Sequence, residues 1–478
     1  MDTSTLEKLP DLFQVNDLAI QNFKSTLRGQ VIMPDDTNYD ETRKVYNGMI
    51  DKRPAMIVKC ANTTDVVACV NFARNNNILL AIRGGGHNAG GLGICDDGLV
   101  IDLSLMKDIK IDTAAKTVSV QGGCLLKELD AATHEAGMAV PAGIFGTTGV
   151  AGLTLGGGLG YLTRQYGLSI DNLLEAEIVL ANGSFVKASA KENTDLFWAL
   201  RGGGGNFGVV VSFLFKLYPV HTIYGGPMLW ELEDSKEIMK WYHNFITKAP
   251  ENINGFFAFL TVPPVAPFPE HLQMKKMCGI VWCYTGAPDK AEEVFKPIRA
   301  VKKPALDFVG PMPLPALQTL FDGLYPPGLQ WYWKADFVKD LNKESIDLHV
   351  KYGSEMPTPL SSMHMYPVNG ATARVNKNDT AWNYRDANYA VVIVGIDSDP
   401  ANKDKIINWA RDYWASLHPY SSGGAYINFI MDEGEDSIKA TYGDNYKKLV
   451  ELKTKYDPQN LFRVNQNIRP LKKEAAGL

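Results

Sequence analysis

The chain of 478 residues lacks the cysteine and histidine patterns that hold metals or build disulfide frameworks. Its six cysteines form no CxxC pair, and its eight histidines form neither an HExxH motif nor a paired-histidine helix. Zinc sites and disulfide-stapled folds normally show such spacings. We therefore expect no metal in this protein.

Excess basic charge and long hydrophobic runs are also missing. The net charge is −5, so no basic field is available for nucleic acid. The longest apolar runs, such as 209–215 and 390–396, fall far short of the roughly 20 residues of a membrane span. Residues 1–14 show no basic segment followed by an apolar one. We expect a cytoplasmic monomer or weak homodimer with no membrane or nucleic-acid partner.

The sequence does contain three glycine clusters before residue 210, and the density of glycine falls near Tyr218. Beyond that point, short strands alternate with helices in an α+β pattern, typical of an antiparallel sheet with helices over one face. A chain of this length exceeds one simple core. We expect domains at 1–218 and 219–430, with 431–478 as a C-terminal segment.

Hydrophobic periodicity, together with capping and turn-forming residues, predicts several local elements. Residues 56–82 predict a strand–helix–strand unit, with Thr64 or Asp65 as the helix cap. Residues 125–137 predict a helix that Gly137 ends, and 173–189 a hairpin that turns at Asn182-Gly183. The C-terminal helix is expected to stop at Asp457-Pro458.

The first glycine cluster, "IRGGGHNAGG", formally satisfies the dinucleotide fingerprint G-x-G-x-x-G/A. A Rossmann unit needs a helix to begin there. Further glycines follow instead, and the next regular element, 98–104, is a strand. What remains is a loop whose backbone N–H groups can wrap an anion. Three such clusters indicate a large anionic, dinucleotide-like ligand.

The order of these motifs resembles the berberine bridge enzyme-like FAD-linked oxidases of the p-cresol methylhydroxylase/vanillyl alcohol oxidase flavoprotein group. The likeness runs through "IRGGGHN", "GLVIDLS", "GVAGLTLGGGLGYLTRQYGLSIDN" and "DLFWALRGGGGNFGVV". It continues in "YGDNYKKLVELKTKYDPQNLFRVNQNI", which matches the family's C-terminal signature. The resemblance covers nearly the whole chain. It implies a two-lobed protein in which residues 1–218 and the tail form the FAD domain and 219–430 the substrate domain.

Within that resemblance, His87 matches the position of an 8α-histidyl bond to the flavin. An imidazole is a nucleophile near neutral pH, and attachment raises the flavin's redox potential; the hard chemistry remains the cofactor's. The alternative is a loop histidine that donates a hydrogen bond to phosphate. The expected FAD contacts are Arg83, Gly84, Gly85, Gly86, His87, Asn88, Gly91, Ala142, Gly143, Phe145, Thr147, Thr148, Gly149, Gly152, Gly156, Gly157, Gly208, Val209, Asn465 and Asn467.

Two positions depart from the family pattern near the flavin. Phe145 stands where many relatives carry a cysteine that makes a second link, so we expect a single histidyl link, as in the 6-hydroxynicotine oxidase branch. Thr148 falls at the small gatekeeper position associated with oxygen access, which is compatible with an oxidase. Arg164 is expected to be structural rather than catalytic.

The catalytic base is the largest departure. Relatives carry a Y-x-N-Y motif whose last tyrosine deprotonates the substrate, and here that residue is Phe429, which takes no proton. The position of another family base falls in the apolar run 389–394. The remaining candidates are Tyr366, Tyr426 and Tyr384, with His364 beside them. For each tyrosine, ordinary packing in the core is the competing interpretation.

The expected function is therefore that of an FAD-linked oxidase. It would take hydride from a hydroxyl-bearing small molecule, a sugar or secondary metabolite, and pass the electrons to dioxygen to give hydrogen peroxide. A first alternative is oxidation of a C–N bond in a cyclic amine or alkaloid, which needs no strong base. A second alternative is a flavin-binding protein with weak or lost turnover.

Overall fold

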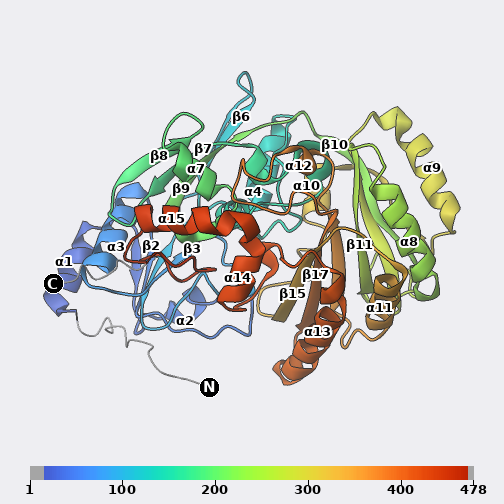
Figure 1. Ribbon diagram of the computed structural model, residues 1–478. Helices are drawn as coiled ribbons and strands as arrows, with labels where there is room; N and C mark the ends of the chain where they lie inside the picture. The colour runs from blue at the N-terminus through green and yellow to red at the C-terminus, as the bar shows by residue number, and fades with distance from the viewer. Residues whose placement is uncertain (1–14, 472–478) are drawn as a thin grey trace.

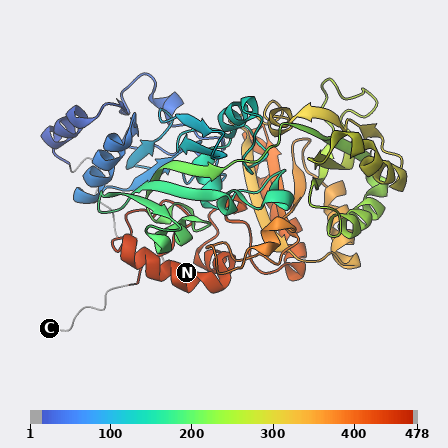
Figure 2. The ribbon, with the colours of Figure 1, turned by 90° about the horizontal axis from the view of Figure 1, so that it is seen from above.

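The computed structural model describes residues 15–471, so the expectation about a leader at 1–14 lies outside the described residues. The molecule is elongated, with the first half of the chain at one end and most of the second half at the other (Figure 1). Three sheets form the framework: a four-stranded and a five-stranded sheet in the first half, and an eight-stranded sheet in the second. The view from above shows the same two lobes (Figure 2).

The four-stranded sheet contains the predicted strand–helix–strand unit. Helix α3, Thr63–Asn75, connects β2 to β3, and both strands lie parallel to β4. The predicted caps are wrong: Asn62 caps α3, with its side-chain oxygen accepting the Asp65 N–H at 3.0 Å. The sheet order is β1 (Gln30–Ile32), β2 (Met56–Lys59), β4 (Leu99–Asp102) and β3 (Leu80–Arg83).

Asp65 does not cap because its carboxylate serves three other backbone N–H groups, those of Arg28, Gly29 and Ala61, each at 2.9 Å. After β3 the chain runs through 84–98 without a helix, which confirms that the first glycine cluster is not a Rossmann turn.

The five-stranded sheet is antiparallel, and two further predicted features lie in this part of the chain. The β7–β8 hairpin turns through Gly183 at φ +83°, and α4, Leu126–Glu135, is followed by Gly137 at φ +70°. Both predictions are confirmed. The sheet order is β5 (Ile109–Asp112), β6 (Thr117–Gln121), β9 (Val209–Lys216), β7 (Leu173–Val179) and β8 (Phe185–Ser189).

The eight-stranded sheet is antiparallel throughout, and helices cover one of its faces. This confirms the α+β expectation. Its strands are β10 (Thr222–Glu231), β11 (Ile253–Thr261), β12 (Lys276–Tyr284), β13 (Leu306–Asp307), β14 (Gly310–Pro313), β15 (Gln330–Val338), β16 (Ser362–Pro367) and β17 (Tyr389–Asp397). The covering helices are α8 (Ser235–Ile246), α9 (Ala291–Val301), α11 (Lys343–Ser354) and α13 (Lys403–Leu417).

Alternation along the strands separates the two faces of this sheet. Phe257, Met363 and Ile393 pack under the helices, whereas Phe256 and Val392 belong to the core that continues into the first half of the chain. The sheet therefore presents a second face toward the glycine-rich loops, and the functional site lies between them.

Buried polar contacts join the two halves. The guanidinium of Arg164 donates to the carbonyls of Ala249 (2.8 Å) and Pro250 (3.0 Å) and to Asn369 Oδ1 (2.8 Å). Asp171 and Arg385 form a buried two-pronged ion pair, with both N···O distances 2.8 Å. Arg164 is thus a structural tie, as the sequence predicted.

The C-terminal segment returns to the first half, where α15 lies across it (Figure 1). This segment contains α14, Glu435–Tyr442, and α15, Tyr446–Tyr456, which stops at the predicted Asp457-Pro458. The Lys453 ammonium is fully buried and donates to the Asn206 carbonyl (2.8 Å), the Phe462 carbonyl (2.8 Å) and Asp457 (2.7 Å). It therefore fastens the tail to the third glycine cluster.

Between residues 15 and 471, no helix combines the length and the apolar character needed to cross a bilayer.

The buried Lys453–Asp457 pair yields a stability prediction. Removing Lys453 leaves the buried Asp457 carboxylate without a counter-charge, bonded only by the N–H groups of Leu461 and Phe462, so Lys453→Met should lower the free energy of unfolding by about 3–5 kcal/mol. Lys455→Met is the matched control, because Lys455 lies in the same helix and pairs with Asp195 at the surface. The control should cost less than about 1 kcal/mol. Urea unfolding of the two variants measures the difference, and equal midpoints would contradict the structural role of Lys453.

Candidate functional site

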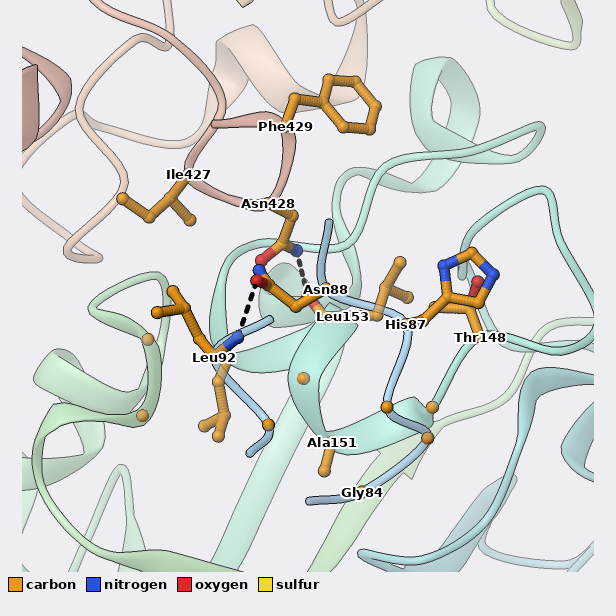
Figure 3. A pocket seen from close by; sticks show the side chains of 18 of the residues that line it. Gly84, His87, Asn88, Leu92, Thr148, Ala151, Leu153, Ile427, Asn428 and Phe429 are labelled. Carbon is orange, nitrogen blue, oxygen red and sulfur yellow. Dashed lines mark hydrogen bonds between the residues drawn. The ribbon is translucent and has the colours of Figure 1, made fainter. Parts of the chain in front are cut away.

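A cavity of about 280 Å³ lies between the glycine-rich loops and the face of the large sheet that the helices do not cover. All three glycine clusters reach it, together with the C-terminal segment and strands β15 to β17. Figure 3 shows part of its wall, with His87 and Thr148 at one side and Asn428, from the short 3-10 helix Ile427–Phe429, pointing toward the loops. A single chamber thus collects segments that are more than 300 residues apart in the chain.

The first two glycine clusters touch backbone to backbone. A Cβ atom on Gly85 would lie 2.4 Å from the backbone nitrogen of Gly149, and a Cβ on Gly149 would lie 2.4 Å from that of Gly85. No side chain fits at either position. A Cβ on Gly152 meets nothing within 4 Å, and this residue lines the cavity. The glycines therefore allow a close loop contact at one point and leave open space at another.

His87 projects from the first cluster into the cavity wall. Its Nε2 lies 3.3 Å from the hydroxyl of Thr147, and its ring stacks on Tyr46 with centroids 3.8 Å apart. Burial lowers the pKa of His87 to about 4. The imidazole is therefore neutral at physiological pH and retains a lone pair that can act as a nucleophile or a hydrogen-bond acceptor.

Among the described residues that line the cavity, Arg83 is the only one with a permanent charge. Its guanidinium pairs with the buried Asp102 at 2.7 Å. No cavity-lining carboxylate occurs in residues 15–471. The chamber is thus nearly free of net charge, and an anionic ligand would depend on backbone N–H groups of the loops more than on side-chain cations.

The sheet supplies the opposite wall through every second residue. These residues are Trp331 and Trp333 of β15, Ser362, His364 and Tyr366 of β16, and Val392, Val394 and Ile396 of β17. Within them, the Tyr366 hydroxyl lies 2.8 Å from His364 Nδ1. Burial lowers the pKa of His364 to about 4 and raises the pKa of Tyr366. The wall is aromatic and aliphatic, with one neutral tyrosine–histidine pair.

The segment that carries the altered family motif closes the chamber. The Tyr426 hydroxyl oxygen accepts the Gly158 N–H at 2.8 Å and an Asn428 amide N–H at 2.7 Å. Burial raises the pKa of Tyr426 to about 12. The ring of Phe429 lies 5.6 Å from that of Tyr366 and meets Trp333 edge-on. Phe429 is therefore part of the aromatic wall.

Most of the predicted residues meet at this cavity, and some do not. The Tyr384 hydroxyl donates to the Ala440 carbonyl at 2.7 Å, and its ring stacks on Phe337, so Tyr384 lies outside the lining. Tyr366 and Tyr426 line it, with Arg83, Gly84, Gly85, Gly86, His87, Asn88, Gly143, Phe145, Thr148, Gly149, Gly152, Gly208 and Asn465. Outside the lining are Gly91, Ala142, Thr147, Gly156, Gly157, Val209 and Asn467, of which Thr147 contacts His87.

Other lining residues were not predicted from the sequence. Glycine density alone would have indicated the loop of Gly204, Gly205 and Asn206. Trp331 and Trp333 stand in an aromatic-rich part of the sequence that suits either a ligand wall or an ordinary core, and nothing local decides between the two, because the register that points them inward is set by pairing with β17.

Several buried polar atoms on the lining fit a polar, planar ligand. Asn465 Oδ1, Ser362 Oγ and the indole nitrogens of Trp331 and Trp333 have no hydrogen-bond partner in the described part of the chain. Buried polar groups are normally paired, and because these residues line the cavity, their free atoms can bond a group bound there. Together with the glycine loops they fit FAD, whose pyrophosphate suits the backbone loops and whose ring system carries donors and acceptors.

Comparison with known families agrees with this geometry. Residues 54–189 match the model of the FAD binding domain, and residues 425–469 match the model described as berberine and berberine like. Fold and site thus define a flavoprotein oxidoreductase.

Full-length relatives give the family. The chain is 31% identical to an FAD-linked oxidoreductase of Dictyostelium discoideum, over 95% of this chain and 97% of the relative. It is 27% identical to (R)-6-hydroxynicotine oxidase of Paenarthrobacter nicotinovorans, over 93% and 97% of the two chains. The protein belongs to the berberine bridge enzyme-like family and is an FAD-dependent oxidoreductase.

Solved structures show the same fold. The crystal structure of 6-hydroxy-D-nicotine oxidase from Arthrobacter nicotinovorans superposes with a TM-score of 0.84 at 26% identity, over 93% of this chain and 98% of that one. The berberine bridge enzyme-like protein 1 of Physcomitrella patens also gives 0.84, at 25% identity over 95% and 100% of the two chains.

The contact between the glycine loops is testable by flavin content. Gly85→Ala forces the loops apart, because its Cβ would lie 2.4 Å from the backbone of Gly149. We expect the ratio of flavin to protein absorbance to fall about tenfold, which corresponds to a loss of about 1.4 kcal/mol in the free energy of cofactor binding. Gly323→Ala is the control, because nothing lies within 4 Å of its Cβ. Full flavin content in Gly85→Ala would refute the proposed loop contact.

Proposed function

We propose that this protein is an oxidase that takes hydride from a carbon bearing a hydroxyl group, in a sugar or secondary metabolite, and passes the electrons to dioxygen to give hydrogen peroxide. One observation carries the proposal: a single chamber is lined on one side by His87 and the glycine loops and on the other by the Tyr366–His364 pair. The flavin-binding and proton-accepting parts of an oxidase thus share one space.

The cofactor would be held by the first half of the chain and the tail. We propose 1–218 as the FAD domain, 219–430 as the substrate domain and 431–478 as the returning segment. The glycine loops would receive the pyrophosphate, Asn465 would contact the flavin ring, and a single bond from His87 would attach the flavin. Phe145, at the cavity wall, offers no second link. When bound, FAD supplies the two-electron acceptor.

The proton of the substrate hydroxyl would leave through Tyr366. As the C–H bond breaks with its electron pair, that proton moves to Tyr366 Oη and the tyrosine's own proton moves to His364 Nδ1. A neutral imidazole 2.8 Å away makes this transfer direct. The proton that His364 receives would then be consumed in hydrogen peroxide when dioxygen takes up the electrons, and burial, which lowers the pKa of His364 to about 4, favours that release. This route would replace the tyrosine base of the relatives, whose position Phe429 occupies here.

The other predicted residues take supporting roles in the proposal. The Tyr426 oxygen already accepts two hydrogen bonds, so we assign it the task of holding the Gly158 loop. Thr148 lines the chamber and would leave oxygen a path to the flavin.

A second candidate function is oxidation of a C–N bond in a cyclic amine. The chamber has no carboxylate among its described lining residues, and a neutral amine can lose hydride without a strong base. The full-length likeness to (R)-6-hydroxynicotine oxidase favours the same chemistry.

Anaerobic flavin bleaching with a panel of sugars, aromatic alcohols and cyclic amines distinguishes the two candidate functions. A flavin that dithionite reduces and no panel member reduces would instead favour a protein that has lost turnover.

The histidyl link predicts that the flavin survives denaturation. Acid-precipitated wild-type protein should be yellow, and His87→Ala should release its flavin into the supernatant. His271→Ala is the control, because His271 is exposed and outside the cavity lining. A colourless pellet from the wild type would rule out the covalent bond.

The proton route predicts a selective loss of flavin reduction. Tyr366→Phe and His364→Gln should each slow anaerobic flavin reduction by an alcohol substrate about a hundredfold, the usual contribution of acid–base catalysis. Flavin absorbance after stopped-flow mixing measures the rate. Tyr384→Phe is the matched control, since that hydroxyl bonds the Ala440 carbonyl outside the cavity. Unchanged rates in both test variants would remove this pair from the mechanism.

A further inference from the structure

We infer that Tyr46 is the positioning residue that holds the His87 imidazole in place for attachment to the flavin. This inference rests on the proposed histidyl link. Tyr46 does not line the cavity. Its ring instead stacks on the His87 ring, with centroids 3.8 Å apart and planes 22° from parallel.

Tyr46 is itself fixed at three points. Its backbone N–H donates to the Gly86 carbonyl at 3.0 Å, and its own carbonyl accepts the Gly328 N–H at 3.0 Å. Its hydroxyl donates to the Tyr325 carbonyl. The residue is buried, with 6% of its surface exposed. The aromatic plane beneath His87 therefore has little freedom to move.

Asn47, the next residue, adds further bonds to the same support, and we call the segment 46–48 the brace. Asn47 donates through its amide to the Ala89 carbonyl (2.7 Å) and the Trp331 carbonyl (3.0 Å), and its side-chain oxygen accepts the Trp331 N–H at 3.0 Å. The segment 46–48 thus bonds both to the loop that carries His87 and to the start of β15. A strand of the substrate sheet and the histidine loop share one support.

The second glycine cluster restrains the imidazole at its edge. The Thr147 hydroxyl lies 3.3 Å from His87 Nε2, and the loop that carries Thr147 is anchored by Asp322, which accepts the Gly146 N–H at 2.9 Å. Tyr46 controls the tilt of the ring, and Thr147 restrains its rotation. Of the two, only the stacking contact covers the ring face, so the face orientation depends on Tyr46.

Orientation matters because attachment joins two specific atoms. A ring nitrogen of His87 would bond to the 8α carbon of the flavin, and the imidazole proton, one methyl proton and the two electrons of the broken C–H bond would pass to the flavin ring system. Dioxygen then takes up both electrons and both protons as hydrogen peroxide. The nitrogen must approach that carbon closely and in line, and misplacement by about 1 Å slows such a reaction up to about a hundredfold.

The test adds FAD to the purified variants and, after a fixed time, compares the acid-stable flavin with the total bound flavin. Tyr46→Leu, which removes the aromatic face, should retain bound FAD but reduce the acid-stable fraction at least about tenfold at a fixed time after FAD is added. Tyr46→Phe keeps the ring and should restore the wild-type fraction. Tyr39→Leu is the matched control: Tyr39 is a buried tyrosine whose hydroxyl also donates to a carbonyl, that of Pro54, without stacking on His87.

The outcomes separate this inference from the proposed function. Release of flavin from acid-treated wild type overturns the histidyl link and the role of Tyr46 together. An acid-stable wild type with an equally acid-stable Tyr46→Leu overturns the role of Tyr46 alone. Should Tyr46→Leu be insoluble, Tyr46→Met fills a similar volume without an aromatic face and gives the same readout. Equal loss in Tyr39→Leu would mean that any damage to this region lowers attachment, which also refutes the inference.

Discussion

The close approach of Gly85 and Gly149 is the constraint on which the rest of the site depends. Backbone meets backbone there because a Cβ at either position would lie 2.4 Å from the other residue's nitrogen. The contact places the loop of His87 against the loop of Thr147 and Thr148. The Lys453 ammonium then fixes the third glycine loop by bonding the Asn206 carbonyl. Three glycine-rich segments thus gain a defined arrangement from one steric and one electrostatic contact.

The chamber between these loops and the sheet is nearly free of charge, and this governs its chemistry. Burial keeps His364 neutral and Tyr366 protonated, so in the proposed mechanism the pair would act as a relay and not as a standing base. A standing carboxylate would have to pay for desolvation in such an aromatic environment. Phe429 suits this arrangement because its ring packs against Tyr366. The loss of one family tyrosine is compatible with retained chemistry.

Several turns, helix ends and the α+β class could be predicted from the sequence alone, and the physical reasons are clear. Glycine punctuation and hydrophobic periodicity located the hairpin at Gly183, the stop at Gly137 and the α+β second half. The caps of α3 were predicted wrongly because Asp65 bonds Arg28 and Gly29, which lie far away in the chain. Tyr384 was a candidate base because its neighbours resembled a motif, yet its hydroxyl bonds Ala440. Local patterns do not reveal which hydroxyls tertiary contacts have already used.

The brace at 46–48 illustrates what lies beyond sequence patterns altogether. It resembles no motif, and its partners Ala89 and Trp331 are separated by more than 200 residues. Yet it fixes the histidine loop and the first strand of the substrate wall to a single backbone segment. Movement of β15 would shift Tyr46 through Gly328, and with it the ring stacked on His87. Under the proposed histidyl link, flavin attachment would therefore be coupled to the shape of the sheet wall, and substitutions that reshape the wall near Trp331 would also act on the position of His87.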